Sequence, residues 1–131
     1  MDFLNPATWA KPRGYSNGVA AEGRQIFVAG QVGWNAAGVF ESDDFAVQAR
    51  QALHNVAAVL AAGGAQPSHI VRLTWYVLDK REYLAALREI GAAYREAIGA
   101  HFPAMTLIQV SGLVEDRARL EIEATAVVPH A

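Results

Sequence analysis

Two glutamates near the end of the chain, Glu121 and Glu123, carry carboxylates of a type that can transfer protons. They lie in a run where apolar and polar residues alternate, Arg119 to Val128, so a β-strand would place both carboxylates on one face. Such neighbours are about 7 Å apart, and one small pocket would use only one of them. A carboxylate at an apolar boundary can exchange a proton with water or substrate near neutral pH. The alternative is a strand glutamate that is solvated or paired with Arg119 or Arg72.

The other residue types used in catalysis form no motif. The chain has no cysteine, which excludes a thiolate nucleophile and a zinc site of the cysteine type. Ser111–Gly112 lacks the surroundings of a hydrolase nucleophile, and the run 62–65 lacks the lysine and hydroxyl of a phosphate loop. The histidines also lack the spacing of metal ligands, so we expect no metal site; they are His54, His69, His101 and His130.

Three aromatic residues each allow two interpretations. Tyr15 could donate a hydrogen bond to a ligand or seal a subunit boundary. Trp34 follows a Gly-Gln-Val-Gly segment and could cover a pocket or anchor a protein interface. Trp75 alternates with apolar neighbours and is expected in the core.

Composition narrows the classes of partner. The chain is 53% hydrophobic and 18% charged, which favours an oligomer that hides apolar surface. A net charge of −2 and a pI near 6.0, without a basic segment, argue against nucleic acid as a partner. No apolar run is long enough to span a bilayer and no signal peptide is evident, so we expect no membrane partner and a cytoplasmic location.

The first half of the sequence predicts an extended arm, short strands and a helix. Prolines and glycines mark residues 1–18 as the arm, and Gln25 to Gln31 is rich in strand formers. Val32 to Ser42 reads as an exposed loop. Helical spacing of apolar residues follows from Asp43 to Ala62, with Ser42 or Asp43 as the cap and Gly63–Gly64 as the stop; the buried positions are Phe45, Ala49, Leu53, Val56 and Leu60.

The second half predicts a central strand, a helix and two further strands. His69 to Asp79 is the central strand, with Val71, Leu73, Trp75 and Val77 on one face. A helix from about Lys80 to Gly99 should bury Leu84, Leu87, Tyr94 and Ile98, and strands at Met105 to Val110 and Arg119 to Val128 follow. The order β-β-α-β-α-β-β indicates one α+β domain over residues 1–131, a mixed sheet with both helices on one face.

Six stretches in this order resemble the YjgF/RidA (reactive intermediate deaminase) family. They are Arg13–Ser16, Phe27–Val32, Gln48–Gly64, Ile70–Asp79, Phe102–Leu107 and Leu120–Val127. The resemblance implies a chorismate-mutase-like fold, a homotrimer with a barrel-like core, and small-molecule pockets at the subunit interfaces. It implies no metal and no organic cofactor.

The resemblance also implies which residues form the pocket. Tyr15, the pair Gly30–Gln31 and Glu121 match the family's pocket tyrosine, Gly-Gln pair and glutamate. The family's arginine, which binds the substrate carboxylate, is replaced here by Met105. This departure indicates an arginine-lacking branch and leaves open whether Arg13 or Arg72 supplies the charge. The family's serine, helix asparagine and frequent cysteine correspond to Ala29, Leu87 and Leu107.

These residues lead to two hypotheses about function. The first is an enzyme that adds water to an imine, enamine or related intermediate, with Glu121 as the proton-transfer group and Tyr15, Ala29, Gly30, Gln31, Trp34, Leu87, Met105 and Leu107 binding the substrate. The second is a ligand-binding or interaction protein that keeps the same trimeric scaffold without turnover. RNA cleavage, a third possibility, is disfavoured by the acidic balance of charge.

Overall fold

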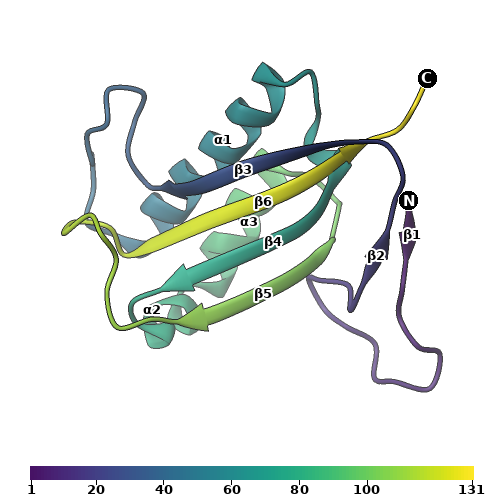
Figure 1. Ribbon diagram of the computed structural model, residues 1–131. Helices are drawn as coiled ribbons and strands as arrows, with labels where there is room; N and C mark the ends of the chain where they lie inside the picture. The colour runs from purple at the N-terminus through teal and green to yellow at the C-terminus, as the bar shows by residue number, and fades with distance from the viewer.

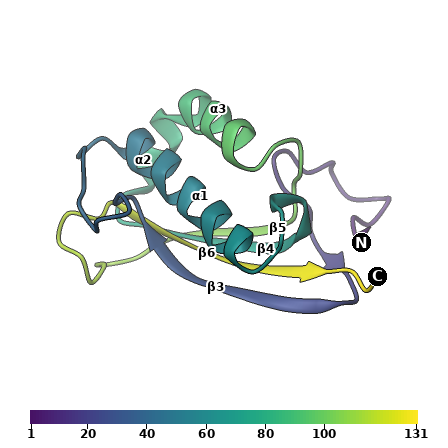
Figure 2. The ribbon, with the colours of Figure 1, turned by 90° about the horizontal axis from the view of Figure 1, so that it is seen from above.

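The structure, a computed structural model that describes residues 1–131, has a four-stranded sheet with all its long helices on one side (Figures 1 and 2). Its elements are β1 (Asp2–Phe3), β2 (Val19–Ala20), β3 (Arg24–Val32), α1 (Phe45–Ala62), the short helix η1 (Pro67–His69), β4 (Ile70–Val77), α2 (Lys80–Ala85), α3 (Leu87–Ala97), β5 (Ala104–Gln109) and β6 (Leu120–Val128). None of the helices has the length and apolar character needed to cross a membrane.

The sheet is mixed, and its strand order is β3-β6-β4-β5. β4 and β5 run parallel, while β6 pairs antiparallel with both β3 and β4. Figure 2 shows α1, α2 and α3 over one face of this sheet and no helix over the other. The α+β class and the placement of the helices on one face are therefore confirmed.

Alternation along β6 divides its side chains between the two faces as predicted. Leu120, Ile122, Ala124 and Ala126 are buried in the main core beneath the helices. Glu121 and Glu123 are half-buried on the opposite face, which we call the open face. The alternation predicts correctly which side chains of β6 are buried, because the side chains of one face all lie in the main core beneath the helices.

α1 buries the predicted apolar residues, all of which are at most 4% exposed: Phe45, Ala49, Leu53, Val56 and Leu60. Its cap differs from the prediction, because Asp44 rather than Ser42 or Asp43 accepts a hydrogen bond from the Val47 amide. The stop is as predicted, and Gly64 has a φ of 75°, which a residue with a side chain rarely adopts.

The predicted helix over 80–99 is wrong in two respects. It is divided at Ala86 into α2 and α3, and Leu84 and Leu87 are exposed rather than buried. The break lies at Ala86, whose φ of −117° and ψ of 20° depart from helical values, and Tyr83 near the end of α2 packs edge-on against Trp75 and Phe45. In α3, Ile90 and Ala93 occupy the buried positions, with Tyr94 as predicted.

Two smaller predictions also need correction. Ile70, rather than Val71, fills the core at the start of β4, because the pairing with β6 shifts between Ile70 and Arg72 and leaves Val71 as an extra residue. The loop after β3 is not wholly exposed. Val32 and Phe40 form a second buried cluster with Ala118.

The N-terminal arm lies at one end of the sheet (Figure 1). Its short strands β1 and β2 pair with each other, a feature that the turn-rich sequence did not predict. Ser16 fastens the arm to the start of β5: its amide donates to the Pro103 carbonyl at 3.0 Å, and its hydroxyl donates to the Phe102 carbonyl at 2.7 Å. These two hydrogen bonds hold the arm against the start of β5, the edge strand of the sheet.

Candidate functional site

Glu121 is an unpaired carboxylate on the sheet. It projects from β6 onto the open face, is half-buried, and makes no ion pair or side-chain hydrogen bond within the chain. Its carboxylate rests against the backbone of Gly30, where an added Cβ would lie 2.5 Å from Glu121 Oε2. Only glycine leaves room for the carboxylate in this position, so the structure brings together two residues that the sequence analysis selected.

The alternative partners of Glu121 are engaged elsewhere or separated from it. Arg119 donates to Glu82 at 3.2 Å and to the Asp43 carbonyl, on the helix side of the strand's start. Arg72 projects from β4 beside Thr125 and forms no ion pair. The carboxylate of Glu121 therefore stays available to a molecule from outside the chain.

Glu123 differs from Glu121 because it already has a partner. The Tyr76 hydroxyl donates a hydrogen bond of 2.6 Å to Glu123 Oε1. This bond, together with burial and the nearby negative charges of Glu123 and Glu121, raises the pKa of Tyr76 above its ordinary value. Glu123 thus accepts a side-chain hydrogen bond within the chain, whereas Glu121 accepts none.

The open face around these glutamates also exposes apolar side chains. Phe27 on β3 is 71% exposed, and Ile108 on β5 is 44% exposed, although both lie in the middle of their strands. Phe27 pairs with Thr125, and Ile108 pairs with Tyr76, so both share the face of Glu121. A sheet face with exposed aromatic and aliphatic residues is the usual mark of an interaction surface.

The neighbours of Gly30 line the same part of β3. Ala29 and Gly30 stand opposite Glu123 at a β-bulge, because the pairing of β3 with β6 shifts between Val28 and Gln31. Ala29 is exposed, and its carbonyl accepts a hydrogen bond from the side chain of Gln31. Trp34 packs against Phe40 in the second cluster and is half-buried.

Met105 and Leu87 border a cavity on the other face of the sheet. The cavity has a volume of about 300 Å³ and lies between β4, β5 and the helices α2 and α3. Its walls are mainly apolar, and besides Met105 and Leu87 they include Trp75, Tyr83, Ile90 and Phe102. Burial raises the pKa of Tyr83, and the indole nitrogen of Trp75 is buried without a hydrogen-bond partner. We call this space the helix-side cavity.

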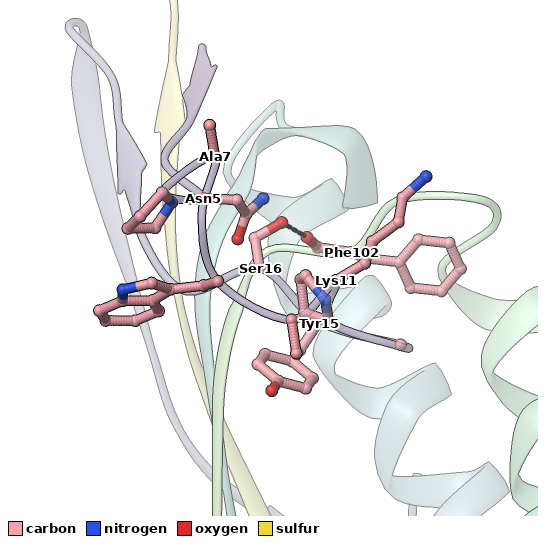
Figure 3. Close-up of a pocket in the computed structure, with 11 residues that line it drawn as sticks. Asn5, Ala7, Lys11, Tyr15, Ser16 and Phe102 are labelled. Carbon is pink, nitrogen blue, oxygen red and sulfur yellow. Dashed lines mark hydrogen bonds between the residues drawn. The ribbon is translucent and has the colours of Figure 1, made fainter.

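Two predicted site residues lie near this cavity without lining it. Leu107 pairs with Trp75 and packs against the main core. Tyr15 is 39% exposed and lines a separate groove of about 530 Å³ along the N-terminal arm, together with Lys11 and Phe102 (Figure 3). Gly14 and Phe102 line both the groove and the cavity, so Tyr15, which follows Gly14 in the arm, lies next to the cavity.

Within one chain the predicted site residues therefore form two groups. Glu121, Ala29, Gly30 and Gln31 belong to the strand pair β3–β6, and Glu121 faces away from the helices. Met105 and Leu87 lie at the opposite edge of the sheet, on the helix side. A single protomer cannot present both groups to one small molecule.

Two residues of these surroundings were missed by the sequence analysis. Tyr76 was not singled out, although its alternation with Trp75 places it on the face of the glutamates. Arg95 lines the helix-side cavity, whereas the two arginines considered from the sequence do not. The signal for Arg95 was its helical spacing of four from Gly91 and eight from Leu87, which places all three on one stripe of α3.

Comparison with known proteins identifies relatives over nearly the whole chain. The family described as Endoribonuclease L-PSP matches residues 8–128. The 2-iminobutanoate/2-iminopropanoate deaminase of Escherichia coli strain K12 is 35% identical over 105 residues, which make up 80% of this chain and 80% of that protein.

Solved structures of the same group share the fold. A conserved Rid family protein from Yersinia pestis, YyfB, superposes with a TM-score of 0.85 at 36% identity, covering 97% of this chain and 98% of that one. Escherichia coli TdcF, crystallised with bound serine, has a TM-score of 0.70 at 27% identity over 98% of each chain. The likeness thus includes the strands and helices that hold both groups of residues.

Proposed function

We propose that this chain, which belongs to the YjgF/RidA (Rid, endoribonuclease L-PSP) family, hydrolyses an imine, enamine or related intermediate of small-molecule metabolism. The observation that carries the proposal is the carboxylate of Glu121, which is half-buried, has no partner in the chain and rests against Gly30. The deaminase names of similar proteins support the type of reaction.

In the proposed reaction, Glu121 moves protons while water supplies the oxygen. The carboxylate takes a proton from water as the water oxygen bonds to the imine carbon, and passes that proton to the imine nitrogen, which gives a carbinolamine. The carbinolamine then collapses: Glu121 takes the hydroxyl proton as the carbonyl forms and passes it to the nitrogen, the C–N bond breaks, and ammonia leaves. One imine and one water give one carbonyl compound and one ammonia.

We further propose that the site forms between copies in a homotrimer with a chorismate-mutase-like, barrel-like core. The exposed Phe27 and Ile108 on the open face give the copies a surface to bury. The separation of Glu121 from Met105 supports the same arrangement, because a neighbour's glutamate could then meet this chain's cavity. Light scattering at micromolar concentration should give about three times the chain mass of 14.1 kDa. A stable monomer would contradict the interface site.

Met105 supports assignment to an arginine-lacking branch of the family. A thioether cannot form the paired hydrogen bonds that a guanidinium gives to a carboxylate. Leu87, on the same cavity, is likewise apolar. We therefore expect the hydrolysis of 2-iminobutanoate-like acids to be absent or far slower than in a relative that keeps the arginine.

The test of the proposal compares two glutamine variants. Imines are generated in situ from amino acids by an amino-acid oxidase, and the release of ammonia is followed with and without the protein. Glu121→Gln keeps the size of the side chain and removes proton exchange, so it should abolish turnover while the oligomer persists. Glu123→Gln is the matched control on the same face and should retain most activity. An active Glu121→Gln protein would show that this glutamate is structural.

A non-catalytic ligand-binding protein on the same scaffold is the second candidate. The helix-side cavity favours it, because its lining within one chain includes no carboxylate or histidine. Ligand binding without ammonia release from any imine tested would support this candidate over the enzyme.

A further inference from the structure

Arg95 is the only charged residue that lines the helix-side cavity. It lies in the last turn of α3, where the partial negative charge at the end of the helix favours a cation. Four other arginines of the chain are paired with carboxylates, namely Arg50, Arg81, Arg117 and Arg119, but Arg95 forms no ion pair. Its guanidinium is free to take an anion from outside the chain.

Gly91 lets Arg95 lie close to the helix. A Cβ added at Gly91 would be 3.7 Å from Arg95 Nη1, so the guanidinium lies along the face of α3 one turn before its own position. Leu87 precedes Gly91 by another four residues and belongs to the same wall. The wall thus has a charged end at Arg95 and an apolar end at Leu87.

Across the cavity the surroundings are apolar and aromatic. Met105 of β5 lies where a strand arginine was expected from the resemblance, and Tyr83 and Ile90 contribute further apolar surface. A volume of about 300 Å³ is at the small end of the range for small-molecule sites, and it suits the body of a metabolite-sized ligand.

We infer that the helix-side cavity binds carboxylates with an aromatic or branched aliphatic body, and that Arg95 on α3 holds the carboxylate in place of a strand arginine. The inference rests on the proposed function, for which it names the substrate class: imino or enamine acids with bulky apolar side chains. A guanidinium and a carboxylate form two parallel charge-assisted hydrogen bonds, which fix the orientation of the ligand. The apolar walls then select bulky side chains over a methyl or ethyl group.

Binding of stable analogues tests the inference without any need for turnover. Titration calorimetry on the intact oligomer would compare phenylpyruvate, its neutral counterpart phenylacetone, and pyruvate. Phenylpyruvate should bind at least about ten-fold more tightly than either of the others. Arg95→Gln should weaken phenylpyruvate by about ten-fold or more and leave phenylacetone within two-fold.

The matched control is Arg88→Gln, which removes an exposed charge from the same helix outside the cavity. It should bind phenylpyruvate like the unaltered protein. Equal affinity of the Arg95→Gln and unaltered proteins, or no preference for phenylpyruvate over pyruvate, would overturn the inference.

Glu121→Gln separates the two proposals. If it binds phenylpyruvate normally and releases no ammonia, both proposals are supported. If the unaltered protein binds phenylpyruvate through Arg95 but hydrolyses no imine, the inference about the cavity holds and the enzymatic proposal fails. If turnover depends on Glu121 but binding does not depend on Arg95, the enzymatic proposal holds and the inference about the cavity fails.

Discussion

Gln48 makes three hydrogen bonds to the backbone, and its replacement by leucine is expected to destabilise the fold by about 3 kcal/mol. The side chain is 1% exposed. Its Nε2 donates to the carbonyls of Ser42 at 2.9 Å and Arg117 at 3.0 Å, and its Oε1 accepts from the Arg119 amide at 2.9 Å. Gln48 therefore ties the start of α1 to the segment that leads into β6.

The magnitude follows from counting these bonds. Leucine has a similar volume, so the change opens little space but leaves two carbonyls and one amide without partners. Each lost bond contributes about 1 kcal/mol net, which gives the total of about 3 kcal/mol. For a domain of this size the melting temperature should fall by roughly 10 °C.

Urea denaturation followed by circular dichroism at a fixed protein concentration would measure the change. The matched control is Gln51→Leu on the same helix, because Gln51 forms one hydrogen bond, 2.8 Å to Asn55. This variant should lose less than about 1 kcal/mol. If Gln48→Leu were as stable as Gln51→Leu, the three bonds would not be the constraint that fixes the start of β6.

Two further predictions concern Gly30 and Glu96. In Gly30→Ala the new Cβ, 2.5 Å from Glu121 Oε2, should push the carboxylate back by about 1 Å and lower imine hydrolysis about 100-fold. The stability of Gly30→Ala should not change. The control is Gly112→Ala, whose Cβ meets nothing within 4 Å. Full activity of Gly30→Ala would refute the reasoning. The hydrogen bonds from Arg50, with His54 Nε2 3.3 Å from the same carboxylate, lower the pKa of Glu96 from 4.5 to about 2. The stabilising effect of the ionised Glu96 carboxylate should thus be complete above pH 4.5 and disappear as the pH falls toward 2. In urea titrations, the difference in free energy of unfolding between the unaltered protein and Glu96→Gln should shrink over that range. A difference that persists at pH 2 would contradict the assignment.

The sequence predicts elements well where one physical constraint dominates. The alternation in β6 and the apolar stripe of α1 were correct because each element buries one complete face in the same core. The division of the second helix at Ala86 could not be predicted, since residues 80–99 contain no proline and the only interior glycine lies elsewhere. Tyr83 packs against Trp75 and Phe45 beside this break, and its contact with Phe45 joins residues 38 positions apart, which local sequence patterns do not reveal.

The candidate site was predictable in its residue types but not in its assembly. Glu121 and Gly30 meet because the pairing of β3 with β6 brings them together. Arg95 was not considered as a replacement for the missing arginine, since sequence alone does not reveal which arginines lack a carboxylate partner. The separation of Met105 from Glu121 likewise depends on the order of the strands, because β4 lies between β5 and β6.

The position of β6 in the sheet has a consequence for the order in which the chain can fold. β6 is the last strand to be synthesised, yet it lies between β3 and β4 and pairs with both. Until it emerges, β3 and β4 lack the strand that joins them, and the apolar face of α1 has only part of its sheet to cover. Most of the chain lies between β3 and β6, and contacts between residues so far apart in the sequence form slowly. Glu121 arrives on the strand that completes the sheet, so its contact with Gly30 can form only in a chain whose sheet is complete.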